Sequence, residues 1–375
     1  MKKLNIIIIL IDGGRLDRAQ NSSIFSSLKN NSTFFSNSIT YGPHTIAAMH
    51  AIFSGCYGNR TGTNSYWSTY NFQKNKFKTL TEYLNESGLV TYADLHSEIV
   101  IPKQGFDKFE IYDETTEDIT SRHCNLLENV SNDEKNFFLY LHYSKIHTGI
   151  RDEVLKKYTN FSKEYYDNQE LNVTRYDKFF LESEIYLKTI NEKIQSLDLD
   201  TNSLILVMSD HGVGIGEKMG EVAYGAFCYD YTLKTFGYLF YPGINPTEIT
   251  QQIRTIDFMP TILDYLKIDL DKNYENLDGE SLLPLINGEF MSEKTAFSET
   301  GNPFDEKRPP KEPNTRSIRT SKWKLILNDY DGTRELYDLE NDPTESKNLI
   351  DKNYEIEEKL LNELLQISKK QNSEK

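Results

Sequence analysis

Three short runs of apolar residues, far apart in the chain, constrain the fold more strongly than any other feature. They cover Ile6–Ile11, Phe137–Leu141 and Leu204–Met208. Continuous apolar runs of this length are typical of strands in a parallel sheet, because such strands are buried on both faces. A helical pattern over Tyr176–Leu197, with Ile185 among its apolar positions, lies between the second and third runs. This alternation predicts an α/β fold with a mostly parallel sheet flanked by helices.

The character of the sequence changes after about Gly288. Short strand-like segments and an amphipathic helix follow, with a turn at Asp331-Gly332. The sequence therefore predicts two units: an α/β domain over residues 1–288, and a small C-terminal subdomain over residues 289–375 with antiparallel strands and a terminal helix. The predicted strands and helix of the second unit are Ser317–Arg319, Trp323–Leu327, Glu335–Leu339 and Tyr354–Ser368.

The charge of the chain argues against some partners. It has 57 acidic residues against 42 lysines and arginines, a net charge of −15 at pH 7, and no basic block. We therefore expect no binding to nucleic acid or to an anionic membrane. No segment approaches the roughly 20 apolar residues of a membrane span, so no membrane insertion is expected. The three cysteines predict no disulfide framework, which favours a reducing, cytoplasmic compartment.

Each apolar run ends at ionisable side chains. The first run leads into Asp12, the second into His142 and His147, and the third into Asp210 and His211. Ligands of open α/β sheets bind beyond the carboxyl ends of the strands, so these ends predict one shared site. Carboxylates and imidazole bind divalent cations, and Asp12, Asp210 and His211 are candidate metal ligands. The alternative for each aspartate is a helix N-cap or a solvated loop residue.

Thr45 is the candidate nucleophile. Gly42 and Pro43 end the preceding strand, and the apolar run after Thr45 predicts a buried helix. At a helix N-terminus, backbone N–H groups and the helix dipole stabilise an anion. A threonine hydroxyl at such a place, bound to a metal, loses its proton readily and becomes a nucleophile. The alternative is that Thr45 only caps its helix.

Several segments, in order along the chain, resemble the sulfatase family of the alkaline phosphatase superfamily. The resemblance implies an alkaline-phosphatase-like fold and a metal-dependent esterase. Such an enzyme transfers a sulfuryl or phosphoryl group from a small-molecule ester to its own nucleophile, and then usually to water. The segments are Asn5–Asp12, Thr45–Gly62, Ser209–Gly212, Leu277–Leu285 and Glu335–Glu345.

The resemblance also implies residue roles. Asp12, Asp210 and His211 match the positions that hold the metal, and Thr45 matches the nucleophile, which also contacts the metal. His147 falls where the family places a histidine beside the ester oxygens, which implies leaving-group protonation or contact with the anion.

His96 is a second histidine with an implied role, in binding the substrate. It falls near the Lys-x-His segment of the family, although Asp94 stands where the lysine would be.

The nucleophile segment departs from the family pattern. Family sulfatases carry a Cys or Ser followed by x-Pro-Ser/Ala-Arg, which is oxidised to formylglycine, whereas this chain has Thr45-Ile46-Ala47-Ala48-Met49. Threonine cannot yield that aldehyde, and a threonine ester must be cleaved by attack at sulfur or phosphorus. Because that step is ordinary for phosphoryl enzymes, Thr45 favours phosphate esters or phosphodiesters over sulfate esters.

The number of metal ions expected here differs from that of a second group of enzymes in the superfamily. Phosphodiesterases with a threonine nucleophile use two zinc ions, and the second ion needs an Asp four residues before a His. Here Tyr143 stands four residues before His147, and no histidine follows His211. We therefore predict one divalent ion, Ca, Mg, Mn or Zn, with positive side chains in place of the other. The candidates are Lys218 in catalysis, Arg15 in substrate binding, and Lys145 and Arg151.

Two further functions stay open. One is transfer of the phosphoryl-linked group to an acceptor alcohol, as in phosphoethanolamine and phosphoglycerol transferases. The other is a degenerate family member that binds an anionic ester without turning it over. Met49 and Asp94, in place of the arginine and lysine of the family, support the latter.

Overall fold

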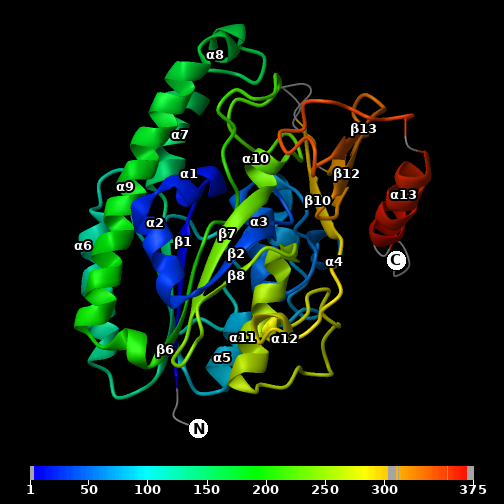
Figure 1. Ribbon diagram of the computed structural model, residues 1–375. Helices are drawn as coiled ribbons and strands as arrows, with labels where there is room; N and C mark the ends of the chain where they lie inside the picture. Colours follow the sequence, from blue (N-terminus) through cyan, green and yellow to red (C-terminus); the bar gives the residue numbers. More distant parts are fainter. Residues whose placement is uncertain (1–3, 303–309, 311, 353, 370–375) are drawn as a thin grey trace.

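A nine-stranded sheet forms the centre of the protein in the computed structural model, which describes residues 4–302, 310, 312–352 and 354–369 (Figure 1). Its strands are β1 Asn5–Ile11, β2 Thr33–Ile39, β3 Val90–Leu95, β4 Lys108–Ile111, β5 Phe137–Tyr143, β6 Ser203–Met208, β7 Lys234–Phe240, β8 Thr247–Ile249 and β9 Ile253–Arg254. The order is β4-β3-β5-β1-β6-β7-β2-β8, and β9 pairs with β2. Among the described pairings of this sheet, only those that β7 makes with β6 and β2 are antiparallel. The predicted, mostly parallel sheet is confirmed.

The three apolar runs form the central strands of this sheet. β1 lies between β5 and β6, and Ile8 pairs with Tyr140 on one side and Leu206 on the other. All three strands are buried along their whole length. Their carboxyl ends therefore meet at one edge of the sheet, as the sequence predicts.

Helices cover both faces of the sheet (Figure 1). Ile7, Ile9 and Ile11 of β1 pack into one core, and Ile6, Ile8 and Leu10 pack into the other. The first core includes α1 Leu16–Asn21, α2 Ser23–Leu28, α6 Ile119–Ser131, α7 Lys145–Ile150, α8 Lys163–Asp167 and α9 Gln169–Ser196. The second includes α3 Thr45–Ser54, α5 Leu80–Glu86, α11 Phe258–Leu266 and α12 Leu283–Ile286. The two remaining short helices are α4 Gly58–Thr61 and α10 Asp230–Leu233.

The long helix α9 differs in detail from its prediction. It begins at Gln169 rather than at Tyr176, and Ile185 is 61% exposed. Tyr186 and Ile190 are buried as predicted. Neighbouring residues of a helix point about 100° apart, so the face that buries Tyr186 turns Ile185 to solvent.

The C-terminal residues form a second, antiparallel sheet. Its strands are β10 Ala296–Thr300, β11 Thr315–Arg319, β12 Trp323–Asn328 and β13 Thr333–Asp338, in that order. The terminal helix α13, Tyr354–Lys369, buries Leu360 and Leu364 in a core with Ile318 and Leu325. This architecture confirms the predicted antiparallel strands and helix and adds β10, whereas the boundary at residue 288 stays a prediction.

No helix in the described part of the chain is both long and apolar enough to cross a bilayer. All three cysteines are free thiols.

Candidate functional site

Asp12 lies at the centre of the candidate site, directly after β1, and it is fully buried. Its two oxygens face different neighbours. Oδ1 lies 3.4 Å from Thr45 Oγ1 and 3.6 Å from His211 Nε2. Oδ2 lies 3.0 Å from His142 Nε2 and 3.9 Å from His147 Nδ1. One carboxylate therefore joins two groups of polar side chains.

The segment after β6 supplies the second carboxylate and an imidazole. Asp210 Oδ1 accepts hydrogen bonds from the backbone N–H groups of Gly13 (3.2 Å) and His211 (2.9 Å). His211 Nδ1 lies 2.7 Å from the carbonyl oxygen of Gly212, so this nitrogen carries the proton and Nε2 faces the carboxylates. A Cβ at Gly212 would lie 2.2 Å from the carbonyl oxygen of Tyr231, so the close turn requires glycine.

Thr45 is the first residue of α3. His44 is the N-cap, and its Nδ1 accepts from the N–H of Ala47 at 3.4 Å. The Thr45 hydroxyl is turned to the site, 3.3 Å from His211 Nε2 and 3.4 Å from Asp12 Oδ1. Capping is therefore done by the preceding residue.

Two buried carboxylates in one place need positive charge. Burial, and to a lesser degree the Asp12 carboxylate, raises the pKa of Asp210. Burial also raises the pKa of Asp12, but the neighbouring histidines, His147 first, lower it by more. The pKa of Asp12 is therefore below its usual value. Within the described residues Asp210 Oδ2 is buried without a hydrogen-bond partner.

These residues fit a divalent cation. Asp12, Asp210 and His211 each offer one ligand atom, and the three atoms lie within 4.8 Å of one another. The unpartnered oxygen of Asp210 and Nε2 of His211, the ring nitrogen that does not face the carbonyl oxygen of Gly212, are suitable ligand atoms. The structure thus brings together all four predicted metal-site residues, including Thr45.

His142 and His147 approach the other oxygen of Asp12, and His96 lies beside both of them. The ring of His96 lies 4.6 Å from that of His142 and 5.3 Å from that of His147, between ring centres. Tyr140 OH lies 2.9 Å from His142 Nδ1, and Tyr224 OH lies 3.1 Å from His147 Nδ1. Both histidines predicted to contact the substrate, His96 and His147, are brought to the site.

The sequence placed His142 at a strand end of the shared site but assigned it no role, and it did not identify Glu114. His142 ends β5, so its position at a strand end was a usable signal. Glu114 lies in a loop, and its ligand oxygen comes within 4.8 Å of those of His96 and His147 only through the fold.

Lys218 lies away from this cluster. Its ammonium group donates to the carbonyl oxygen of Glu345, and its nitrogen lies 4.6 Å from the ring centre of Tyr229. These partners belong to the C-terminal part of the molecule and to the segment before α10, because the loop after His211 turns Lys218 toward the antiparallel sheet.

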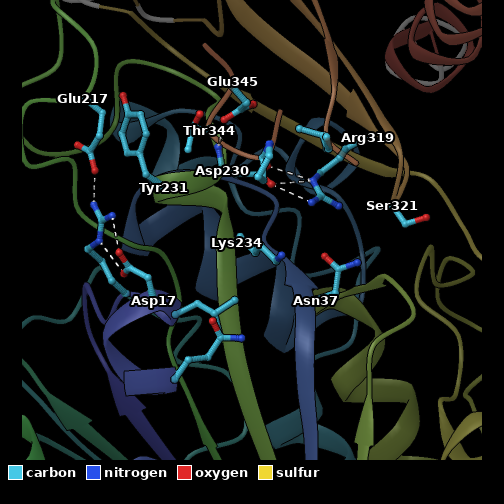
Figure 2. Close-up of a pocket in the computed structure, with 15 residues that line it drawn as sticks. Asp17, Asn37, Glu217, Asp230, Tyr231, Lys234, Arg319, Ser321, Thr344 and Glu345 are labelled. Atoms are coloured by element: carbon cyan, nitrogen blue, oxygen red, sulfur yellow. Dashed lines mark hydrogen bonds and ion pairs between the residues drawn. The ribbon is translucent and has the colours of Figure 1, made fainter. Parts of the chain in front are cut away.

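Arg15 is also paired with groups outside the cluster around Asp12. It lines a polar pocket of about 350 Å³, in which Figure 2 shows Asp17 and Glu217. Its guanidinium lies 2.9 Å from Asp17 Oδ2 and 2.6 Å from Glu217 Oε1, and donates to the carbonyl oxygen of Val213. None of these described partners belongs to the cluster around Asp12.

The other two positively charged side chains that were predicted at the site, Lys145 and Arg151, lie at the outer edge of the histidine cluster, beside Glu114. Lys145 Nζ donates to the carbonyl oxygen of Glu114 at 2.9 Å, and Arg151 forms ion pairs with the carboxylates of Glu114 and Asp152. Asp94, at the lysine position of the family, is 2.8 Å from Arg122, and burial raises its pKa to about 6.

Comparison with known proteins supports one family throughout the chain. The profile described as Sulfatase matches residues 5–268, and the profile described as N-sulphoglucosamine sulphohydrolase, C-terminal, matches residues 224–370.

Two curated relatives match about half of the chain. Choline-sulfatase from Rhizobium meliloti (strain 1021) is 29% identical over 189 residues, which are 49% of this chain and 35% of the relative. Arylsulfatase K from Canis lupus familiaris is 28% identical over 197 residues, 48% of this chain and 34% of the relative. The alignments thus span about a third of these longer proteins.

Solved structures share the fold over nearly the whole chain. A 2-O GAG sulfatase has a TM-score of 0.79 at 18% identity, covering 98% of this chain and 93% of that one. The phosphonate monoester hydrolase of Agrobacterium radiobacter has a TM-score of 0.79 at 14% identity, covering 98% and 96%. The fold is therefore alkaline-phosphatase-like, and, on the family profile, the chain belongs to the sulfatase family.

Proposed function

We propose that the protein is a metal-dependent hydrolase of small-molecule sulfate or phosphate esters that acts through a covalent intermediate on Thr45. The observation that carries this proposal is the position of the Thr45 hydroxyl, 3.4 Å from Asp12 and 3.3 Å from His211. A divalent cation held by Asp12, Asp210 and His211 supplies, when bound, the charge that lowers the pKa of a hydroxyl and neutralises ester oxygens. Ca, Mg, Mn and Zn all suit this ligand set.

In this proposal each step of ester cleavage is assigned to particular groups of the protein. The Thr45 oxygen attacks the sulfur or phosphorus, and the bond to the leaving alcohol breaks as the Thr45 ester forms. Because α3 starts at Thr45 and is ten residues long, its first N–H groups and dipole favour the ester oxygens. Water then attacks the same atom, which releases the acid anion and restores the hydroxyl.

His147 is the candidate proton donor to the leaving oxygen. Its side chain is 17% exposed, whereas those of His142 and Asp12 are fully buried. A histidine that reaches solvent can regain its proton after each turnover, and it can act as base when water attacks the Thr45 ester.

A preference for phosphate esters over sulfate esters rests on the nucleophile segment. Thr45 cannot form an aldehyde, and Met49, where the family has arginine, is fully buried in the apolar core. We therefore expect phosphomonoesters, phosphodiesters or phosphonate esters to be turned over faster than aryl sulfates.

A substrate panel tests this function. Phosphomonoester, phosphodiester, phosphonate and sulfate aryl esters are assayed with each of the four metals. We expect Thr45→Ala to lower kcat by at least about 10³-fold and Thr45→Ser to keep measurable turnover. Thr81→Ala, which changes a buried threonine on α5, is the matched control and should keep full activity. If Thr45→Ala turned over substrate at the wild-type rate, Thr45 could not be the nucleophile.

Two outcomes would favour the alternative functions. Accumulation of a glycerol ester when glycerol is added would indicate transfer to an alcohol. Absence of turnover across the panel, together with bound ester, would indicate the degenerate member, for which the pairing of Asp94 with Arg122 is the supporting observation.

A further inference from the structure

The polar pocket of about 350 Å³ is lined by residues of both sheets, and none of its described lining residues belongs to the cluster around Asp12 (Figure 2). We infer that this pocket is a second binding site, which takes a small α-hydroxy or α-amino carboxylate. The carboxylate of the ligand pairs with the ammonium group of Lys234, and its hydroxyl or amino group donates to Asn37 Oδ1. This site does not depend on the proposed function.

Lys234 is the first observation that points to a ligand. It is the first residue of β7, it is half-buried, and it lines the pocket. Its ammonium group has no hydrogen bond or ion pair with any described residue. Burial and then the nearby Arg319 lower the pKa of Lys234, and Asp230 offsets only part of this effect. The ammonium group therefore lacks a counter-ion at a place where water solvates it poorly.

The four carboxylates that line the pocket are already paired with other cations. The pairs are Asp17 and Glu217 with Arg15, Asp230 with Arg319 and Lys324, and Glu345 with Lys324. One singly charged carboxylate would therefore balance Lys234. Phosphate or sulfate would bring more negative charge next to these four carboxylates, and their repulsion makes such dianions poorer ligands.

Asn37 is the second observation. It lies where the pairing of β2 with β7 shifts between Phe35 and Ser38, and such an irregularity redirects side chains. Its Nδ2 donates to the carbonyl oxygen of Thr250 at 3.4 Å, whereas Oδ1 is buried and accepts no hydrogen bond from a described residue. A buried acceptor of this kind needs a donor. A hydroxyl or amino group next to the ligand carboxylate supplies one.

The size of the pocket limits the ligand. Its volume of about 350 Å³ is near the lower end for small-molecule sites, which measure roughly 300–1,000 Å³. We therefore expect acids of a few carbon atoms, such as glycolate and glycine. The competing explanation is that the pocket holds only water, which solvates Lys234.

Calorimetric titration of the full chain distinguishes these explanations. Sodium glycolate, glycine, sodium acetate and sodium phosphate are the probes. We expect one glycolate or glycine per chain, bound more tightly than acetate or phosphate. Lys234→Met should weaken glycolate binding at least about tenfold, because a charge-assisted hydrogen bond is lost. Asn37→Ala should reduce the affinity for glycolate to that for acetate.

The matched control is Lys193→Met. Lys193 is a half-buried lysine on α9, 2.6 Å from Glu128 Oε2, and this variant should bind glycolate as the wild type does. Asp210→Asn should also keep glycolate binding. If binding were lost in Asp210→Asn and kept in Lys234→Met, the carboxylate would bind in the candidate active site. That result would overturn this inference and leave the proposed function intact.

Two other results would also overturn the inference. One is a wild type that binds neither glycolate nor glycine at millimolar concentration. The other is phosphate bound more tightly than glycolate in a way that depends on Lys234.

A labelling experiment on the wild type provides a readout that no folding defect can disturb. Lysines are reductively methylated with formaldehyde, with and without glycolate, and the modified residues are mapped by mass spectrometry. Glycolate should protect Lys234 and leave the labelling of Lys193 unchanged. Equal labelling of Lys234 in both samples would contradict the assignment. Circular dichroism verifies that the variants fold.

Discussion

At the scale of single residues, the site depends on short side chains that follow buried strands. Asp12, Asp210 and His211 could be predicted because a strand end fixes where a short side chain lies. Arg15 and Lys218 could not, because a long cationic side chain points to whichever carboxylate or carbonyl group lies nearby, and those partners come from distant segments.

Gly212 gives a prediction at this scale. In Gly212→Ala the added methyl group would lie 2.2 Å from the carbonyl oxygen of Tyr231, so the turn that presents His211 must shift. We expect a loss of about 1–3 kcal/mol in the free energy of unfolding, measured by urea denaturation, and weaker metal binding.

The control for this variant is Gly243→Ala, where the Cβ meets no atom within 4 Å but φ is +82°. The free energy of unfolding of this variant should fall by about 1–2 kcal/mol, because of the backbone conformation alone. Its metal affinity should be unchanged. Unaltered metal affinity in Gly212→Ala would contradict the role of the turn.

At the scale of elements, the loop between His211 and α10 is held by a buried carboxyl group. Glu221 accepts hydrogen bonds from the N–H groups of Ala226 and Phe227 and from Tyr231 OH. Sequence pattern does not identify such a loop anchor, because its partners are backbone groups that gather only when the loop closes.

This anchor makes stability depend on pH. Burial raises the pKa of Glu221 from 4.5 to about 7. Between these values the folded protein binds a proton that the unfolded chain has lost, so this contribution is complete below pH 4.5 and is lost as pH rises through 7. Glu221→Gln keeps an acceptor for the two N–H groups without this titration.

Thermal unfolding at pH 5 and pH 8 measures the effect. The difference in unfolding free energy between the two pH values should shrink in Glu221→Gln by up to about 3 kcal/mol relative to wild type. An unchanged difference would mean that the buried carboxyl group does not titrate in this window.

At the scale of the whole molecule, buried ion pairs join the antiparallel sheet to the central one. Lys324 of β12 is fully buried, 2.9 Å from Asp230 Oδ1 and 2.7 Å from Glu345 Oε1. Arg319 of β11 also pairs with Asp230, at 2.8 Å, as Figure 2 shows. Asp230 is the first residue of α10, next to β7, so this network crosses between the two sheets.

Lys324→Met removes the shared cation. It leaves two carboxylates in a buried place with less positive charge, and we expect a loss of about 3–5 kcal/mol in the free energy of unfolding. Denaturant titration measures this loss. Lys322→Met, on an exposed lysine paired with Glu340, should change stability by less than about 0.5 kcal/mol. Equal effects of the two variants would contradict the structural role of the network.

The sequence by itself determined the central strands, the α/β class, and the antiparallel C-terminal strands and helix, and it predicted four side chains that the fold brings close together, Asp12, Thr45, Asp210 and His211. Apolar periodicity reports burial locally, and parallel strands bring their carboxyl ends to one edge. Tertiary structure alone decided that His96 and His142 lie beside His147, that Glu114 lies at their outer side, and that Arg15 and Lys218 point elsewhere. These contacts join segments far apart in the chain, and only the packing of the folded protein fixes which side chains meet there.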